Sequence, residues 1–200
     1  MNLRFKKTVA ALGAICLSIA VRGADKKEEA FQPGPASSYK GVQKQGGLSA
    51  GARAYIADSE CRAPFGKLNP NEEGVLPVLL ALENTGKETL NLTGLRARYV
   101  DGGRKFDAVP GAEVKFLRAP SRPRVGPGPI PGINRKKKNP LAAMEIETRG
   151  FSAKMLPAGD RAHGFFYFQA EHLPGGILYI SGIRGAASGN ELFYMEIPID

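Results

Sequence analysis

From Leu48 to the C-terminus, the chain consists of short apolar segments separated by turns rich in glycine and proline. Within these segments apolar side chains recur at every second position, as at Val78, Leu80 and Leu82, and the helical period of 3.6 residues is scarce. Alternation of this kind is typical of strands that bury one face. Many short strands with glycine and proline turns form sandwiches or barrels. We therefore predict that residues 48–200 form an all-β domain, an antiparallel β-sandwich.

The turn Leu156-Pro157-Ala158-Gly159 leads into the aromatic segment Gly164-Phe165-Phe166-Tyr167-Phe168. Apolar side chains lie on both faces of this segment, which predicts a central strand of the sandwich. The other strands are expected at 48–58, 75–84, 90–99 with a bulge at Gly94, 105–109, 114–116, 151–155, 177–183 and 191–199. A loop is expected at 63–74. Residues 140–149 fit either a helical turn after Asn139-Pro140 or a strand from Met144, and we favour the strand.

Glycine and proline positions refine this interpretation. Asp101-Gly102-Gly103 predicts a tight hairpin. Proline cannot donate to a strand ladder, so Pro77 is expected at the beginning of its strand, and Pro198 indicates an edge or terminal strand.

The N-terminus has the pattern of a secretory signal peptide. Arg4, Lys6 and Lys7 precede an apolar run from Val9 to Val21, and small residues follow. We assign residues 1–23 to a signal peptide, with an uncleaved N-terminal anchor as the alternative. Cleavage would lower the net charge from +9 to +5, because four basic residues and no acidic ones leave with the peptide. Residues 24–47 are polar and rich in Gly, Pro and Ser, and we expect them to form a flexible leader.

Two segments carry a family resemblance. The first is Val78-Leu79-Leu80-Ala81-Leu82-Glu83-Asn84-Thr85-Gly86-Lys87, followed by Leu90-Asn91-Leu92. It resembles the strand, asparagine and turn of exported bacterial immunoglobulin-like domains, the DUF4352-like and FxLYD-like families. The segments at 156–168 and 193–198 are similar to their closing strands. The resemblance implies an immunoglobulin-like β-sandwich and an exported, periplasmic or secreted location. It implies no catalytic residue.

The candidate reactive residues do not form a recognisable catalytic pattern. Cys61 follows Asp58 and Glu60, whose carboxylates would raise the pKa of its thiol. His163 and His172 lie at opposite ends of one predicted strand, about 30 Å apart, which is too far for one metal ion. Met144, Met155 and Met195 with a histidine could form a soft copper site, although core packing is the commoner role of strand methionines. We expect a non-enzymatic protein without cofactor or resident metal, and a periplasmic copper-handling protein is an alternative.

A basic segment is the strongest candidate for partner binding. Residues 118–140 form a long loop rich in Pro, Gly, Lys and Arg that contains no acidic residue. The predicted contact residues are Arg118, Arg122, Arg124, Arg135, Lys136, Lys137 and Lys138. Localised positive charge indicates an anionic partner, either another envelope protein or an anionic envelope polymer or lipid. The alternative is a solvated loop whose charge only prevents association. Nucleic acid is not expected, because the segment has no interleaved aromatic residues, and no membrane span is expected after signal cleavage.

Overall fold

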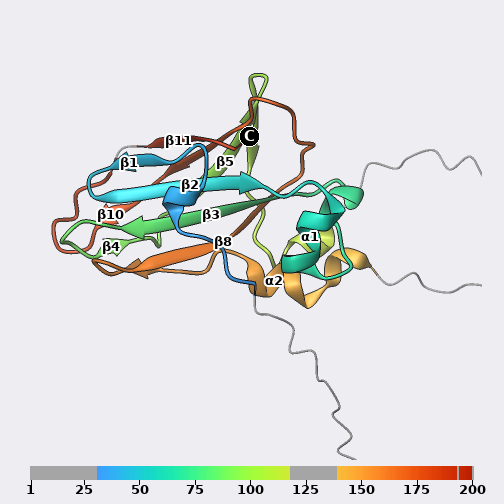
Figure 1. Ribbon diagram of the computed structural model, residues 1–200, viewed down its shortest axis with the longest axis horizontal. Helices are drawn as coiled ribbons and strands as arrows, with labels where there is room; N and C mark the ends of the chain where they lie inside the picture. Colours follow the sequence, from blue (N-terminus) through green and yellow to red (C-terminus); the bar gives the residue numbers. More distant parts are fainter. Residues whose placement is uncertain (1–30, 118–138, 193, 200) are drawn as a thin grey trace, which may run out of the picture. The chain divides into compact units, whose positions relative to one another are not determined.

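The computed structural model describes residues 31–117, 139–192 and 194–199 (Figure 1). Two four-stranded antiparallel sheets form the domain. The first has the order β1 (Gln43–Gln45), β2 (Leu48–Ala54), β3 (Leu76–Asn84) and β8 (Arg161–Phe168). The second has the order β11 (Met195–Pro198), β9 (Ile177–Ser181), β5 (Arg96–Asp101) and β6 (Arg104–Asp107). The predicted all-β antiparallel sandwich is confirmed.

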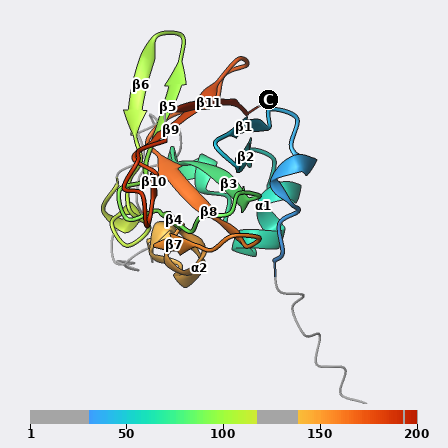
Figure 2. The same ribbon diagram turned by 90° about the vertical axis from the view of Figure 1, so that its left-hand side faces the viewer.

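Shorter elements complete the domain. A small three-stranded sheet has the order β10 (Arg184–Gly185), β4 (Leu90–Asn91) and β7 (Met155–Leu156). The helices are α1 (Asp58–Phe65) and α2 (Met144–Arg149), with the 3-10 turns η1 (Ala36–Ser38), η2 (Pro70–Glu73), η3 (Val114–Phe116) and η4 (Pro140–Ala142). Figure 2 shows the β5–β6 hairpin extending away from the strands of the first sheet. Gly102 and Gly103 close this hairpin with φ of 50° and 83°, as the sequence predicted.

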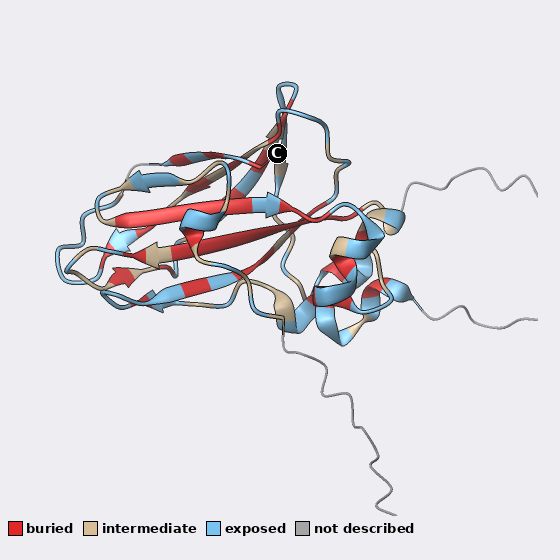
Figure 3. Cartoon of the chain, viewed as in Figure 1, coloured by how far each residue is buried: buried red, intermediate tan, exposed pale blue. Residues whose placement is uncertain are grey.

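The main core lies between the two large sheets. Alternate residues of β3 and β5, such as Leu80, Leu82 and Tyr99, are buried in one apolar cluster with residues of β9 and β11. Figure 3 shows the resulting alternation of buried and exposed residues along β5 and β11, whereas β3 is buried almost throughout. The central strand is therefore β3. Pro77 is its second residue, and β11, which contains Pro198, lies at a sheet edge, as expected.

The prediction that the aromatic strand is central was wrong, because β8 lies at the edge of its sheet. Two backbone hydrogen bonds cover its outer side, from Val109 N to Tyr167 O at 2.8 Å and from Phe151 N to Phe165 O at 3.0 Å. Its second apolar face packs under short helices. Phe165 and Tyr167 form a second cluster with Cys61 and Phe65 of α1 and with Ile146 of α2.

These helices correct three sequence assignments. The predicted loop at 63–74 contains the end of α1 and then η2, and the predicted strand at 114–116 is η3. Val114 is buried and Phe116 is 74% exposed, so their alternation does not mark one buried strand face. Residues 140–149 form η4 and α2, and the favoured strand from Met144 was wrong. In α2, Glu145 and Glu147 near the start and Arg149 near the end complement the helix dipole.

Residues 31–47 differ from the predicted flexible leader. They contain η1 and β1, and β1 pairs with β2. Ala36 of η1 is 1% exposed, and its carbonyl oxygen lies so close to Gly51 of β2 that a Cβ atom there would overlap it. A glycine in a strand often marks such a close backbone approach. This segment therefore packs on the outer face of the first sheet.

Candidate functional site

An open pocket of about 1000 Å³ lies between β5 and the covered edge of β8, and we call it the edge pocket. It forms where β6 stops at Asp107, so that Arg96 and Ala97 of β5 have no partner in β6. Beyond Asp107 the chain crosses towards β8, and Ala108 N donates to Ala97 O at 3.2 Å. The crossing segment, 108–112, forms one wall of the pocket.

Aromatic side chains form the apolar part of the edge pocket. Phe151 and Phe166 stack with ring centroids 5.4 Å apart and an interplanar angle of 18°. Gly164 makes this approach feasible, because a Cβ atom at this position would overlap the backbone of Phe151. Leu95 and Ala97 add further apolar surface from the β5 side.

Polar groups on the second sheet line the other side of the pocket. Arg98 Nε donates to Asp107 Oδ1 at 2.7 Å, between residues that are direct partners in β5 and β6. Arg96 is exposed and is paired in register with Ser181, which also lines the pocket. The Arg96 guanidinium forms no hydrogen bond or ion pair with any residue that the structure describes. Its donors are therefore accessible to a ligand.

The surface next to the pocket carries two stacked tyrosines. Tyr179 of β9 lines the pocket, and its ring stacks on that of Tyr194 with centroids 4.9 Å apart and an interplanar angle of 18°. Tyr194 is 52% exposed. The side-chain alternation of β9 explains the position of Tyr179, because Leu178 and Ile180 point into the core and Tyr179 points outward.

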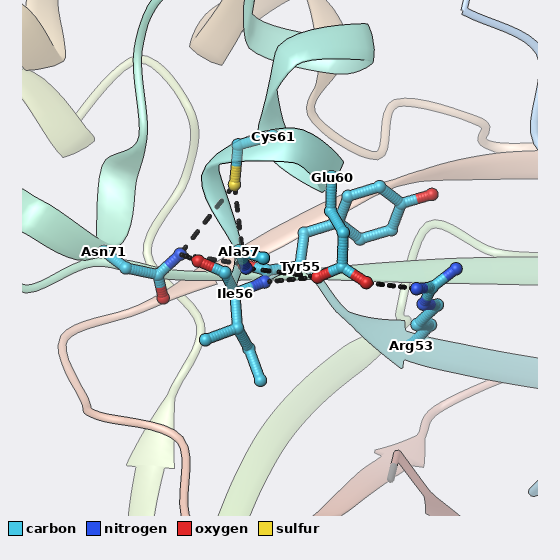
Figure 4. Close-up of polar contacts among 7 residues, drawn as sticks. All are labelled: Arg53, Tyr55, Ile56, Ala57, Glu60, Cys61 and Asn71. Atoms are coloured by element: carbon cyan, nitrogen blue, oxygen red, sulfur yellow. Dashed lines mark hydrogen bonds and ion pairs between the residues drawn. The ribbon is translucent and has the colours of Figure 1, made fainter.

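Cys61 belongs to a different, buried cluster (Figure 4). Its thiol is fully buried, 3.4 Å from Asn69 Oδ1 and 3.7 Å from Tyr55 O. Burial, with smaller contributions from the carboxylates of Glu60 and Asp58, raises the pKa of Cys61 to about 11. The sequence correctly predicted that the carboxylates raise it. Because the thiolate is the reactive form, this thiol is inert at neutral pH.

The residues around Cys61 stabilise the start of α1 through hydrogen bonds and an ion pair. Glu60 accepts hydrogen bonds from Ile56 N at 3.2 Å and Ala57 N at 3.1 Å, and it also pairs with Arg53 (Figure 4). Asn71 Nδ2 donates to Tyr55 O at 2.8 Å. No local sequence pattern indicates this asparagine contact, because Asn71 lies 16 residues from Tyr55.

The elevated thiol pKa predicts a pH-dependent stability. The thiol of the unfolded chain ionises near pH 9, whereas the folded thiol ionises near pH 11. The Cys61 thiol therefore keeps its proton to a higher pH in the folded state than in the unfolded chain. We expect the free energy of unfolding to fall as the pH rises from 9 to 11. Urea titrations at a series of pH values measure this fall. Cys61→Ala should reduce the pH dependence in this range, and an unchanged slope in that variant would contradict the assignment.

The candidate metal ligands have different environments. Met195 is buried in the core, whereas Met144 and Met155 are exposed. His163 lies on β8 opposite Ala81, and His172 Nδ1 lies 3.3 Å from the Tyr99 hydroxyl. In the described ranges, no three His, Cys, Asp or Glu side chains are arranged to hold a metal ion. The core role expected for strand methionines applies to Met195.

All seven predicted partner-binding residues of the basic segment, which lie between 118 and 138, fall outside the described residues. The chain on either side of them is described. η3 and η4 contact each other, and Asn139 Nδ2 donates to Lys115 O at 2.6 Å. Asn139 Oδ1 also accepts from Leu141 N at 3.0 Å and thereby caps η4. The described residues on the two sides of the basic segment therefore lie next to each other. Among the described helices, none has the length and apolar character needed to cross a bilayer.

Comparisons with known proteins give limited similarity. No protein-family model matches the chain, and no curated protein matches it. Among solved structures, a putative lipoprotein (ycdA) from Bacillus subtilis subsp. subtilis strain 168 aligns with a TM-score of 0.38 and 12% identity, covering 79% of this chain and 38% of that protein. This chain thus spans well under half the length of that lipoprotein. Northeast Structural Genomics Consortium target SoR45 aligns with a TM-score of 0.32 and 14% identity, covering 76% of this chain and 82% of that one.

Proposed function

We propose that the protein is an exported, non-enzymatic binding module of the cell envelope with an immunoglobulin-like sandwich. The observation that carries this proposal is the edge pocket, which combines an aromatic wall with the unpaired guanidinium of Arg96. Open pockets with apolar walls and a few polar groups are typical of binding sites. The signal-peptide pattern of residues 1–23 supports export.

The groups around the pocket favour binding over covalent chemistry. Arg98 and Asp107 are paired with each other on the exposed face of the sheet, so that the Asp107 carboxylate is already engaged by a guanidinium. Covalent catalysis needs an activated nucleophile beside a base. The thiol of Cys61 does not line the pocket, and its raised pKa keeps it protonated. Arg96, Tyr179 and Ser181 instead offer hydrogen bonds and an aromatic surface to a bound molecule.

Filling the edge pocket tests the proposal. Ser152 is exposed and lines the pocket, so Ser152→Trp places a large ring in it without disturbing the core. In cells that make the full chain, we expect the fraction retained by washed envelopes to fall about tenfold. Ser37→Trp is the matched control, because Ser37 is an exposed residue of η1 that does not line the pocket. Equal retention of both variants, with unchanged circular dichroism, would refute the proposal.

A second candidate function is electrostatic attachment to an anionic envelope surface through the basic segment 118–140. The specific support is that Phe116 and Met144, near its two ends, are 74% and 76% exposed. Exposed apolar side chains beside a basic segment are typical of surfaces that associate with anionic lipid.

Charge neutralisation tests this second candidate. We expect the triple variant Lys136→Gln, Lys137→Gln and Lys138→Gln to leave the envelope at a lower salt concentration than the unmodified protein. Fewer basic charges attract the anionic surface, so less salt is needed to screen the attraction. The control removes the same charge elsewhere, at the exposed Lys40, Lys44 and Lys154. Identical salt-release curves for the two triple variants would exclude a specific role for the segment.

A further inference from the structure

The outer face of the second sheet carries a row of side chains that cross four strands. The strand register aligns Asp107 with Arg98, Arg98 with Tyr179, and Tyr179 with Glu196. These four residues alternate with core residues and therefore project from the same face. Since neighbouring strands lie about 4.8 Å apart, the row spans about 14 Å.

The tyrosine pair gives this face a flat aromatic surface. Tyr194 stacks on Tyr179 and is 52% exposed, so the pair projects from the sheet instead of filling the core. The face of an aromatic ring carries negative potential. It attracts weakly positive C–H groups such as those on one side of a pyranose ring. The rings form a stacking platform, and Tyr179 also lines the edge pocket.

The charged groups that flank the platform have opposite hydrogen-bonding character. The Arg96 guanidinium only donates hydrogen bonds, and the Glu196 carboxylate accepts them. Within the described ranges, neither side chain has a hydrogen bond or an ion pair, and both are exposed. A hydroxyl group can accept a hydrogen bond from Arg96 and donate one to Glu196. A strongly anionic ligand would be repelled by Glu196, and a cationic ligand by Arg96.

From this arrangement we infer that the outer face of the second sheet binds a neutral, hydroxyl-rich saccharide. Pyranose rings stack on Tyr194 and Tyr179, and ring hydroxyls bond Arg96, Ser181 and Glu196. Because Tyr179, Ser181 and Arg96 also line the edge pocket, the saccharide continues from the tyrosine pair into it. This inference rests on the proposed binding function and specifies the partner as a glycan.

Titration of the purified protein tests the inference. The chain contains no tryptophan and six tyrosines, so its intrinsic fluorescence reports on tyrosine. The probes are cellohexaose, hexa-N-acetylchitohexaose and hexagalacturonic acid. We expect saturable binding of at least one of the two neutral probes, with a Kd between about 10 µM and 1 mM, and weaker binding of the acidic one. Calorimetric titration of the same samples measures the affinity independently of fluorescence.

Variants separate the platform from the hydrogen-bonding groups. Tyr194→Ala should weaken binding of the neutral probe at least about tenfold, whereas Tyr194→Phe should retain most of it because the ring remains. Arg96→Ala and Glu196→Gln should each weaken it several-fold. The exposed Glu191, which is paired with Arg184, supplies the control Glu191→Gln with no expected change.

The outcomes that overturn the inference also distinguish it from the proposed function. Absence of saturable binding of every probe at about 10 mM refutes saccharide recognition, as does tighter binding of hexagalacturonic acid than of both neutral probes. If saccharide recognition is refuted but Ser152→Trp still lowers envelope retention, the binding function stands and its partner is a protein or an anionic polymer. If retention is also unaffected by Ser152→Trp, both proposals fail together.

Discussion

Asn84→Ala is expected to lower the free energy of unfolding by about 3 to 5 kcal/mol. Asn84 is 1% exposed, at the end of β3. Its side-chain amide donates to Glu88 O at 2.8 Å and to Leu156 O at 3.0 Å, and its side-chain oxygen accepts from Gly86 N at 3.0 Å. Alanine would leave these backbone groups without their partner, and a buried polar group that loses its partner costs about 1 to 3 kcal/mol.

The matched control is Asn91→Ala. Asn91 also closes a local turn, through its side-chain oxygen, which accepts from Thr93 N at 2.9 Å and Thr93 Oγ1 at 2.6 Å. These groups are exposed, so water can replace the lost bonds, and we expect a loss below about 1 kcal/mol. Urea denaturation of both variants measures the difference. Losses of similar size would show that the bond to Leu156 contributes little.

Asn84→Asp gives a sharper test of the same contacts. The introduced carboxylate would face two carbonyl oxygens, which disfavours the charged form and raises the pKa of the carboxyl group in the folded state. Stability would therefore be highest below the pKa of the unfolded chain, near 4, and would fall as the pH rises through the folded pKa. A variant that is equally stable at pH 4 and pH 7 would contradict this geometry.

Asn84 also illustrates how far the sequence could predict the fold. The apolar strand, the asparagine and the turn at 84–87 are local features, and the structure places them as expected. The bond to Leu156 joins residues 72 positions apart. No local pattern indicates such a contact, because turn chemistry constrains only a few neighbouring residues.

The aromatic strand shows a second limit of sequence patterns. Apolar residues on both faces of a strand require cover on both sides, but the pattern does not say what provides it. In β8 the second face is covered by α1 and α2, which have eight and six residues. Helices this short have too few turns for a recognisable period, and the single buried apolar residue of α2, Ile146, produces none.

The candidate site was predictable only in part. The alternation of Arg96 and Arg98 with Ala97 and Tyr99 indicates a solvated strand face, and both arginines are exposed in β5. The edge pocket itself depends on the end of β6 and on the contact between Phe151 and Gly164. Both result from packing between distant segments, so the sequence interpretation favoured the basic segment instead.

The N-terminal segment leads to the second large prediction. Gly51 of β2 lies directly under η1, and a side chain there would overlap the carbonyl oxygen of Ala36 and approach Tyr39. Tyr39 can adjust as a flexible side chain, whereas the backbone of Ala36 can move only with the whole turn. We expect Gly51→Val to displace η1 and to lower the free energy of unfolding by about 3 kcal/mol or more, because Ala36 and the outer-face residue Ala81, both now buried, would become exposed.

Hydrogen exchange over residues 31–42 distinguishes local displacement from general destabilisation. In Gly51→Val the amides of this segment should exchange much faster at urea concentrations where β3 remains protected. Lys44→Val is the control, because it places the same side chain at an exposed position of β1. We expect little change in stability or exchange from it. If Gly51→Val leaves both the stability and the protection of 31–42 unchanged, the segment is held only weakly and behaves as the flexible leader that its composition predicted. Rapid exchange confined to residues 31–42 in Gly51→Val would instead show that these residues cover the outer face of the first sheet. The polar composition of the segment does not predict this packing.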